Sequence, residues 1–258
     1  MACSLNLVDS HIHLDFSAFD KDRDVLLVEA QSSGIRRFVV PSTTRKSWPQ
    51  IKNLVLSNPA ISVAYGIHPY FIHAHTLNDC ESLNSWLETH ACVAVGEIGL
   101  DYFIKELDPG QQMEFFKSQL CIAANHRLPV ILHARKALDQ VTRELKLHGI
   151  KRGIVHSFNG SYVQAKRLID MGFKLGFGGA LTYPRATRLQ ALVKQLPLES
   201  ICLETDAPDQ PSSGFAGKRN EPLALLEVLE TVAKLHNTSI EIIAQHTTDN
   251  TYSALNIC

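Results

Sequence analysis

Two histidines near the N-terminus, His11 and His13 in the segment VDSHIHLD, have a spacing that indicates metal chemistry. They follow an apolar run that predicts a β-strand, and a strand sends alternate side chains to the same face. Both imidazoles can therefore point into one space, and neutral imidazole is a common metal ligand. A His-x-His pair also occurs often by chance, so the prediction depends on finding further donors.

Four more candidate donors each come at the end of a later apolar run, namely Glu97 in VGEIGLD, His133 in PVILHAR, His156 in GIVHSF and Asp206 in ICLETDAP. A single histidine at such a position is more often structural, and a single aspartate often only caps the next helix. Six donors in equivalent positions are a stronger signal. Buried imidazoles and carboxylates are costly without compensation, and a bound cation is the usual compensation.

Four imidazoles and two carboxylates are more donors than one tetrahedral zinc ion needs. A centre of two divalent metal ions bridged by Glu97 would use all six. Mixed nitrogen and oxygen donors suit Zn²⁺, Mn²⁺ or Co²⁺, whereas Mg²⁺ prefers more oxygen. Two cations about 3.5–4 Å apart can share a water molecule and lower its pKa. Asp206 is the expected catalytic acceptor of the proton from that water.

Eight short apolar runs alternate with amphipathic segments along the chain, which predicts a parallel sheet covered by helices. The expected strands are Leu5–Ser10, Arg37–Pro41, Ile61–Gly66, Val93–Ile98, Pro129–Leu132, Gly153–His156, Lys174–Gly178 and Ser200–Thr205. The expected helices include Asp22–Ser33, Gly110–His126, Lys136–His148, Tyr162–Gly172 and Glu221–His236. Eight such units favour a (β/α)₈ TIM barrel in a single domain over residues 1–258, with every candidate donor at the mouth formed by the carboxyl ends of the strands.

An open, doubly wound sheet is the alternative architecture. It is disfavoured because no G-x-G-x-x-G follows the first strand and no G-x-x-x-x-G-K-[ST] occurs. The glycine cluster Gly176–Gly179 is interpreted as a bend at a strand end. The long polar segment after Asp206 is expected to be a functional loop.

Composition excludes a global electrostatic attraction to nucleic acid or membranes, because the net charge is -1 and the pI is about 6.9. Six scattered cysteines without a C-x-x-C pair indicate reduced thiols. With no signal peptide and no membrane-spanning run, we expect a cytoplasmic location. Trp48 and Trp86 show no interleaving with basic residues, so no platform for stacking single strands is expected.

The sequence resembles the TatD family of metal-dependent deoxyribonucleases, through VDSHIHLD, YGIHP, VGEIGLDY, PVILHAR, IVHSFNG, LETDAPDQP and KRNEP. The resemblance covers nearly the whole chain. It implies that His11, His13 and Asp206 bind one metal ion, that His133 and His156 bind the other, and that Glu97 bridges them. It also implies phosphodiester hydrolysis at DNA ends, in the 3′–5′ direction, with Mg²⁺ or another divalent ion such as Mn²⁺ or Zn²⁺.

Five further positions receive roles through the same resemblance. His68 and Arg135 are expected to bind substrate. Positioning roles around the ligands are expected for Glu204, Asp101 and Asn220, the last of which shapes a loop. Many relatives read GIHPH where this chain has Tyr70, and this departure bears on substrate preference. His73 and His75 repeat the H-x-H spacing but do not end a strand, so they are interpreted as structural.

Three functions are compatible with these residues. The first is a metal-dependent nuclease acting on DNA ends. The second is a hydrolase with the same site that cleaves a small carboxylic ester, phosphoester or amide, since fold alone does not select the substrate. The third is a metal-stabilised binding protein without catalysis, which the complete set of donors disfavours.

Overall fold

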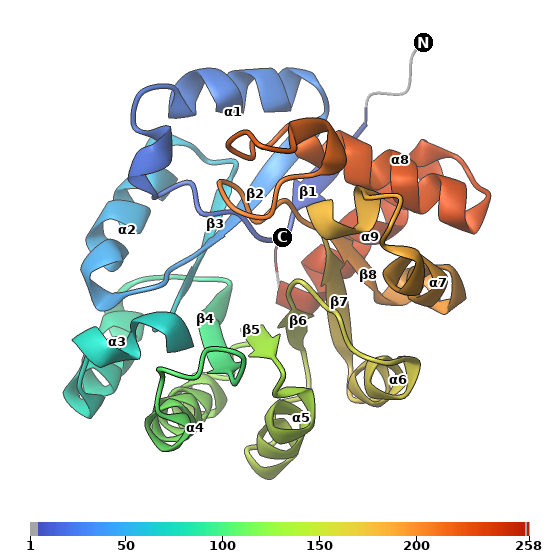
Figure 1. Ribbon diagram of the computed structural model, residues 1–258. Coiled ribbons are helices and arrows are strands. Elements are labelled where there is room, and N and C mark those ends of the chain that lie inside the picture. The colour runs from blue at the N-terminus through green and yellow to red at the C-terminus, as the bar shows by residue number, and fades with distance from the viewer. Residues whose placement is uncertain (1–4, 256, 258) are drawn as a thin grey trace.

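A computed structural model describes residues 5–255 and 257, and it has eight parallel strands paired in sequence order. The strands are β1 (Leu7–Asp9), β2 (Ile35–Pro41), β3 (Ile61–Tyr65), β4 (Ala94–Asp101), β5 (Val130–Arg135), β6 (Gly153–Val155), β7 (Phe173–Phe177) and β8 (Ile201–Leu203). The helices are α1 (Arg23–Ser32), α2 (Trp48–Ser57), α3 (Leu77–Thr89), α4 (Pro109–Asn125), α5 (Leu138–Leu147), α6 (Tyr162–Asp170), α7 (Thr187–Gln195), α8 (Ala224–His236) and α9 (Ile240–Leu255). Figure 1 shows the helices arranged around the strands, which confirms the predicted TIM barrel.

The seam between β8 and β1 is closed by main-chain hydrogen bonds just beyond the two strands. Ser10 N donates to Leu203 O at 2.9 Å, and Asp206 N donates to His11 O at 2.9 Å. Two segments that carry predicted metal ligands are therefore joined directly to each other. Barrel closure and the assembly of the site are achieved by the same hydrogen bonds.

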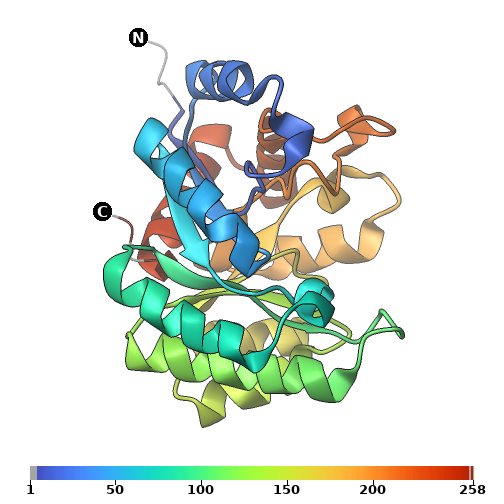
Figure 2. The same cartoon turned by 90° about the vertical axis from the view of Figure 1, so that its left-hand side faces the viewer.

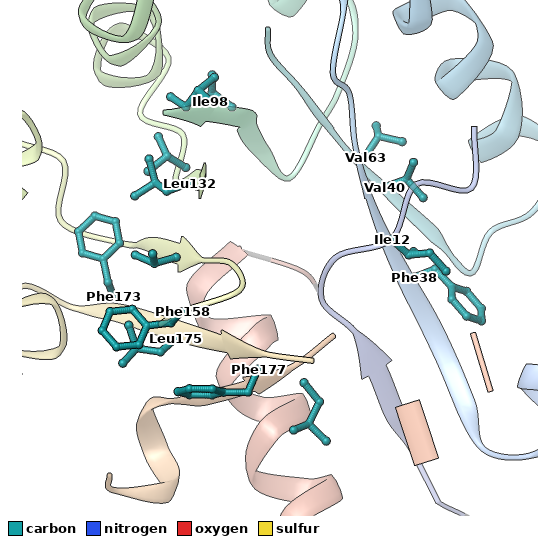
Figure 3. Packing of buried hydrophobic residues seen from close by; sticks show 14 of the residues in the cluster. Ile12, Phe38, Val40, Val63, Ile98, Leu132, Phe158, Phe173, Leu175 and Phe177 are labelled. Carbon is teal, nitrogen blue, oxygen red and sulfur yellow. The ribbon is translucent and has the colours of Figure 1, made fainter. Parts of the chain in front are cut away.

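The strands separate two hydrophobic clusters because alternate side chains point to opposite faces of the sheet. Phe38, Val40 and Leu132 belong to the larger cluster between strands and helices, part of which Figure 3 shows. Val39 and Ile131, their neighbours in sequence, belong to a smaller cluster in the barrel interior. The interior residues are mostly aliphatic, so the barrel is a packed core.

Helix α9 covers the barrel seam, and its C-terminal end adds side chains to the interior cluster. Thr248 Oγ1 donates to Asn6 O, and Asn250 Nδ2 donates to Ile201 O, at the amino ends of β1 and β8. Leu255 and Ile257 pack with the inward-facing strand residues. In Figures 1 and 2 the chain accordingly returns to the barrel near its C-terminus.

All eight predicted strands and all five named helices are present, with shifted ends. His11 and His13 follow the first strand as expected, but β1 already ends at Asp9, so both lie on the segment beyond it. The predictions that Glu97 and His133 close their strands are also wrong, since β4 continues to Asp101 and β5 to Arg135. Helices α2, α3, α7 and α9 were not assigned from sequence. Within the described residues, none of the helices combines the length and apolarity needed to cross a membrane.

Candidate metal centre

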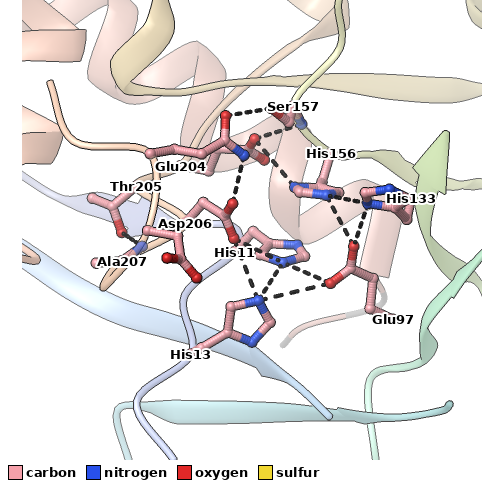
Figure 4. Close-up of polar contacts among 12 residues, drawn as sticks. His11, His13, Glu97, His133, His156, Ser157, Glu204, Thr205, Asp206 and Ala207 are labelled. Carbon is pink, nitrogen blue, oxygen red and sulfur yellow. Dashed lines mark hydrogen bonds and ion pairs between the residues drawn. The ribbon is translucent and has the colours of Figure 1, made fainter. Parts of the chain in front are cut away.

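The six predicted ligands converge at the carboxyl end of the barrel, and the Glu97 carboxylate lies between two groups of them (Figure 4). In the first group His11 Nε2 and His13 Nε2 are 3.3 Å apart. His11 Nε2 lies 3.2 Å from Glu97 Oε2, and His13 Nε2 lies 3.3 Å from Asp206 Oδ1. Two imidazole nitrogens thus face the same two carboxylates.

The other carboxylate oxygen, Glu97 Oε1, faces the second group. It lies 2.9 Å from His156 Nε2, 3.2 Å from His133 Nδ1 and 3.3 Å from His68 Nε2. The ring nitrogens of His133 and His156 are themselves 3.3 Å apart. One oxygen of Glu97 therefore serves each group, which is the arrangement of a bridging ligand.

A bulge in β4 turns the Glu97 side chain into the barrel. The β4–β5 register runs from Val95 opposite Val130 to Ile98 opposite Leu132, so Gly96 and Glu97 together oppose one residue. Both Val95 and Ile98 point to the outer cluster, which an unbroken alternation would not allow. Glycine is required in the bulge because a Cβ at Gly96 would lie 2.7 Å from Ile131 Cβ.

The ligand imidazoles are oriented by carboxylates behind them. Asp101 Oδ2 lies 3.0 Å from the distal nitrogen of His133, Nε2, which leaves Nδ1 for the centre. Glu204 Oε1 lies 3.6 Å from His156 Nδ1 and accepts a 2.6 Å hydrogen bond from Ser157 N. Gly176 leaves room for Glu204, because a Cβ there would lie 2.1 Å from Glu204 Oε2. From sequence, the Gly176–Gly179 cluster is interpreted as a bend at a strand end. In the structure, Gly176 has a more specific role, which is to leave room for a buried carboxylate.

Two groups that sequence reasoning missed hold Asp206 in place. Gln210 Nε2 donates to Asp206 Oδ2 at 2.5 Å, and Ser157 Oγ donates to Gln210 Oε1 at 2.9 Å. Asp206, Gln210 and Ser157 all have left-handed backbone conformations, with φ between 46° and 56°. Non-glycine residues adopt this region at a cost, and such strain is concentrated at functional sites. The sequence carries no signal for this arrangement.

Asp9 is a further buried residue that the sequence analysis did not single out. Its Oδ1 accepts from His11 N at 3.2 Å and from Thr205 N at 3.1 Å, and its Oδ2 accepts from Thr205 Oγ1 at 2.6 Å. Its carboxyl group, whose pKa burial raises to about 8, ties the end of β1 to the segment after β8. It thereby fixes the main chain next to the ligands His11 and Asp206.

The electrostatics of the cluster favour ionised carboxylates. Burial opposes ionisation of Glu97, but the surrounding imidazoles, His156 foremost, lower its pKa well below the usual value. Burial also opposes ionisation of Asp206, and its contacts with His13 and His156 likewise lower its pKa. Burial alone would lower the pKa of His13, but Asp206 and Glu97 raise it to about 9. The carboxylates attract positive charge, and in the metal-free protein this charge comes from protons on the imidazoles.

The donor set fits divalent metal ions. Three triads each have their donor atoms within 4.8 Å of one another: His11 with Glu97 and His156, His11 with His13 and Asp206, and His68 with Glu97 and His133. The side chains that form them are buried or nearly so. Imidazole nitrogens and carboxylate oxygens are donors that suit Zn²⁺, Mn²⁺ or Co²⁺ once the imidazoles have lost their protons.

The other predicted site residues lie around this cluster. His68 reaches the centre, and its Nδ1 accepts a hydrogen bond from Tyr70 N at 3.0 Å. The Tyr70 ring is exposed and packs against Phe71. Arg135 is exposed beside the cavity described below. Asn220 contacts no ligand side chain: it is buried, and its Nδ2 donates to the main chain of the segment after β8.

The second H-x-H pair stays outside the centre. His73 Nδ1 contacts Tyr70 O, and His75 Nδ1 contacts Phe71 O while its Nε2 accepts from Arg45 N. These contacts agree with the structural interpretation of both residues. Of the six cysteines, Cys3 and Cys258 lie outside the described residues, and the other four are free thiols.

A cavity of about 980 Å³ opens beside the second ligand group. His133 and His156 lie in its wall, together with the basic residues Arg135, Lys136 and Arg188. The one acidic residue in this wall, among those the structure describes, is Asp139, which is exposed and pairs with Arg167 at 3.5 Å. The cavity is therefore large enough for a small organic ligand and is biased toward anions.

The comparisons with known proteins agree with this geometry. The family described as TatD related DNase matches residues 8–256. The chain is 37% identical over 253 residues to the uncharacterized metal-dependent hydrolase YjjV of Escherichia coli K12, covering 97% of this chain and 98% of that protein. It is 33% identical over 246 residues to YabD of Bacillus subtilis, an uncharacterized metal-dependent hydrolase, covering 95% and 96%.

Solved structures show the same likeness in three dimensions. The crystal structure of YjjV, a TatD homologue from Escherichia coli K12, superposes with a TM-score of 0.95 at 36% identity and covers 99% of this chain and 100% of its own. A TatD family hydrolase from Entamoeba histolytica shares the fold, with a TM-score of 0.82 at 20% identity and coverage of 98% and 99%. The barrel, its cluster of candidate metal ligands and these matches together place the chain in the TatD family of metal-dependent hydrolases.

Proposed function

We propose that this protein is a two-metal deoxyribonuclease that removes nucleotides from DNA ends in the 3′–5′ direction. The observation that carries the proposal is the bridging position of Glu97, with one oxygen toward each group of imidazoles. His11, His13 and Asp206 would hold one divalent ion, and His133 and His156 the other. Such a pair of ions supplies an acidified nucleophilic water and stabilises negative charge on a phosphoryl oxygen.

Asp206 is suited to accept the proton from the attacking water. Its lowered pKa keeps it ionised near neutral pH. Gln210 holds Oδ2, so that Oδ1 remains directed toward the centre. A carboxylate fixed in this way can take up a proton without rearrangement of the site.

His68 is suited to donate a hydrogen bond to a phosphoryl oxygen. Its Nδ1 accepts from Tyr70 N, which places the proton of the neutral ring on Nε2, the atom that faces Glu97. Burial lowers the pKa of His68 to about 4, so the ring is neutral near pH 7. A neutral donor at this position orients an anionic substrate without repelling bound cations.

The cavity supports a phosphodiester over a neutral ester or amide, because Arg135, Lys136 and Arg188 surround it. These few cations also explain how a chain of net charge -1 can engage DNA, since only nucleotides near an end need to enter. Binding along a longer stretch of duplex DNA would require a basic stripe on the surface, which the composition disfavours.

The test is degradation of single-stranded DNA, labelled at the 3′ or the 5′ end, by chelator-stripped protein supplied with Mg²⁺, Mn²⁺ or Zn²⁺. Metal-dependent shortening from the 3′ end is expected for the wild type, and Asp206→Asn should lose it while retaining metal. If protein that binds two ions shortens no strand with any of these metals, the nuclease proposal is wrong. A panel of small phosphoesters, carboxylic esters and amides would then identify the substrate class.

A further inference from the structure

One wall of the cavity carries an exposed aromatic ring stacked on a cation, a feature that neither the metal centre nor the proposed contacts with a phosphate require. Phe103 follows β4 and is 48% exposed, unlike most phenylalanines of this chain, which are buried. The Arg135 guanidinium carbon lies 3.7 Å from the centre of the Phe103 ring, and Lys136 Nζ lies 4.9 Å from it. All three residues line the cavity that also contains the ligands His133 and His156.

The sheet fixes this stack relative to the metal ligands. Asp101 pairs with Arg135 in the β4–β5 ladder, and Tyr102 N donates to Arg135 O at 2.9 Å. Phe103 N donates to Asp101 Oδ1 at 3.0 Å, and the other oxygen of Asp101 contacts His133. Phe103 is therefore only two hydrogen bonds away from a ligand imidazole.

The backbone supplies a second sign that this wall is specialised. Lys136, directly after β5, has φ of 53°, a left-handed conformation that is unfavourable for lysine. Both charged side chains line the cavity. Among the described residues, neither Lys136 nor Arg135 forms an ion pair within 4 Å. The two charges are thus available to an anionic ligand.

From these observations we propose that Phe103 and Arg135 form a stacking platform for the nucleobase next to the scissile phosphate, with Lys136 on a neighbouring phosphate. The inference rests on the proposed nuclease function and adds the feature that recognises a single strand. Every nucleobase has a π-face, so stacking on a ring or a guanidinium tolerates any sequence. The proposed platform uses neither Trp48 nor Trp86, the two residues on which the expectation of no stacking surface is based.

The experiment compares KM and kcat on two single strands that differ only in their bases. The first is an ordinary oligonucleotide, and the second has abasic nucleotides at the end that is attacked. Metal-loaded wild type, Phe103→Ala and Phe103→Tyr are measured, with Leu147→Ala as a control for loss of an exposed apolar side chain outside the cavity lining. Arg135→Ala is compared with Lys166→Ala, which removes an exposed charge on α6.

On the ordinary strand, Phe103→Ala and Arg135→Ala should each raise KM by about tenfold or more, since base stacking contributes strongly to single-strand binding. Their kcat and metal content should remain near wild type, and Phe103→Tyr, Leu147→Ala and Lys166→Ala should behave as wild type. On the abasic strand, the KM of Phe103→Ala should equal that of the wild type.

Two results would overturn the platform while the nuclease proposal stands. In the first, the wild type cleaves DNA and Phe103→Ala has an unchanged KM on the ordinary strand. In the second, Phe103→Ala raises KM on the abasic strand by the same factor as on the ordinary strand. If the wild type cleaves neither strand with any metal, the nuclease proposal itself fails, and the platform is withdrawn with it.

Discussion

At the scale of single residues, the position of each polar atom divides the centre into ligands and supporting groups. Glu97 presents one oxygen to each group of histidines, whereas Asp101 and Glu204 lie behind His133 and His156. His68 belongs to neither class, because its Nε2 reaches Glu97 but its Nδ1 is occupied by a main-chain N–H. We propose that His68 binds the substrate.

Replacing His68 by alanine should therefore separate substrate binding from metal binding. We expect KM for DNA to rise by about tenfold, the effect of one lost hydrogen bond to a charged group, with two metal ions retained. His73→Ala is the matched control, since His73 is a nearby exposed histidine with only a main-chain contact. Loss of metal from His68→Ala, measured by elemental analysis, would show instead that His68 is a ligand.

Metal binding should release protons. Although burial would lower it, Asp206 and Glu97 raise the pKa of His13 in the metal-free protein to about 9, and the pKa of His156 is also raised. Both rings must lose their protons to become ligands. Metal affinity should thus increase as pH rises toward 9, while the stability that the protonated rings give the metal-free protein is lost over the same range.

Calorimetric titration at pH 7.5 in buffers of different ionisation enthalpy measures this release. Because the released protons are taken up by the buffer, the observed binding enthalpy should vary linearly with the buffer's ionisation enthalpy, with a negative slope. An enthalpy that is the same in every buffer would mean that the histidines are already neutral, and that the carboxylates do not raise their pKa values.

At the scale of elements, the sequence predicts the strands well because their apolar runs are continuous and end at polar residues. It predicts less well the directions in which the donor side chains point. The β4 bulge at Gly96 and Glu97 turns the Glu97 side chain into the barrel, and no residue type in VGEIGLD predicts a bulge there. The sequence also did not predict that the extended segment after β1, which carries His11 and His13, is held by hydrogen bonds to the segment after β8.

The junction between these two segments should be sensitive to Thr205. Thr205→Val removes the hydroxyl that donates to Asp9 Oδ2 and leaves a buried carboxyl oxygen without this partner. We expect the free energy of unfolding to fall by about 1–3 kcal/mol, with kcat reduced because His11 and Asp206 flank the junction. Urea unfolding of the metal-free protein measures the first effect. Thr205→Ser should restore both, and a Thr205→Val protein of unchanged stability would contradict this role for Asp9.

At the scale of the whole molecule, the charge distribution limits how DNA is held. The net charge of -1 provides no long-range attraction, and the cavity beside the centre is lined by three cations, Arg135, Lys136 and Arg188. The sequence could not predict this grouping. Arg135 and Lys136 are neighbours at the end of β5, but Arg188 lies on α7, and only the folded barrel brings it to the same cavity.

Salt dependence tests that distribution. Three cations that each neutralise a phosphate should give a slope of about −2 for the logarithm of affinity against the logarithm of salt concentration, at about −0.7 per phosphate for single strands. The slope is obtained by measuring binding of a single strand to metal-loaded Asp206→Asn over a range of KCl concentrations. A slope of about −5 or steeper would require a basic surface outside the cavity.

The central claim is a centre of two metal ions bridged by Glu97, and the number of ions bound per chain tests it most directly. Chelator-stripped wild type, Glu97→Gln and the control Glu144→Gln, a buried glutamate on α5 outside the site, would be reloaded, desalted and analysed for metal. We predict two ions per chain for wild type and Glu144→Gln, and fewer than two for Glu97→Gln. Two ions retained by Glu97→Gln, or a wild type that binds only one, would contradict the account.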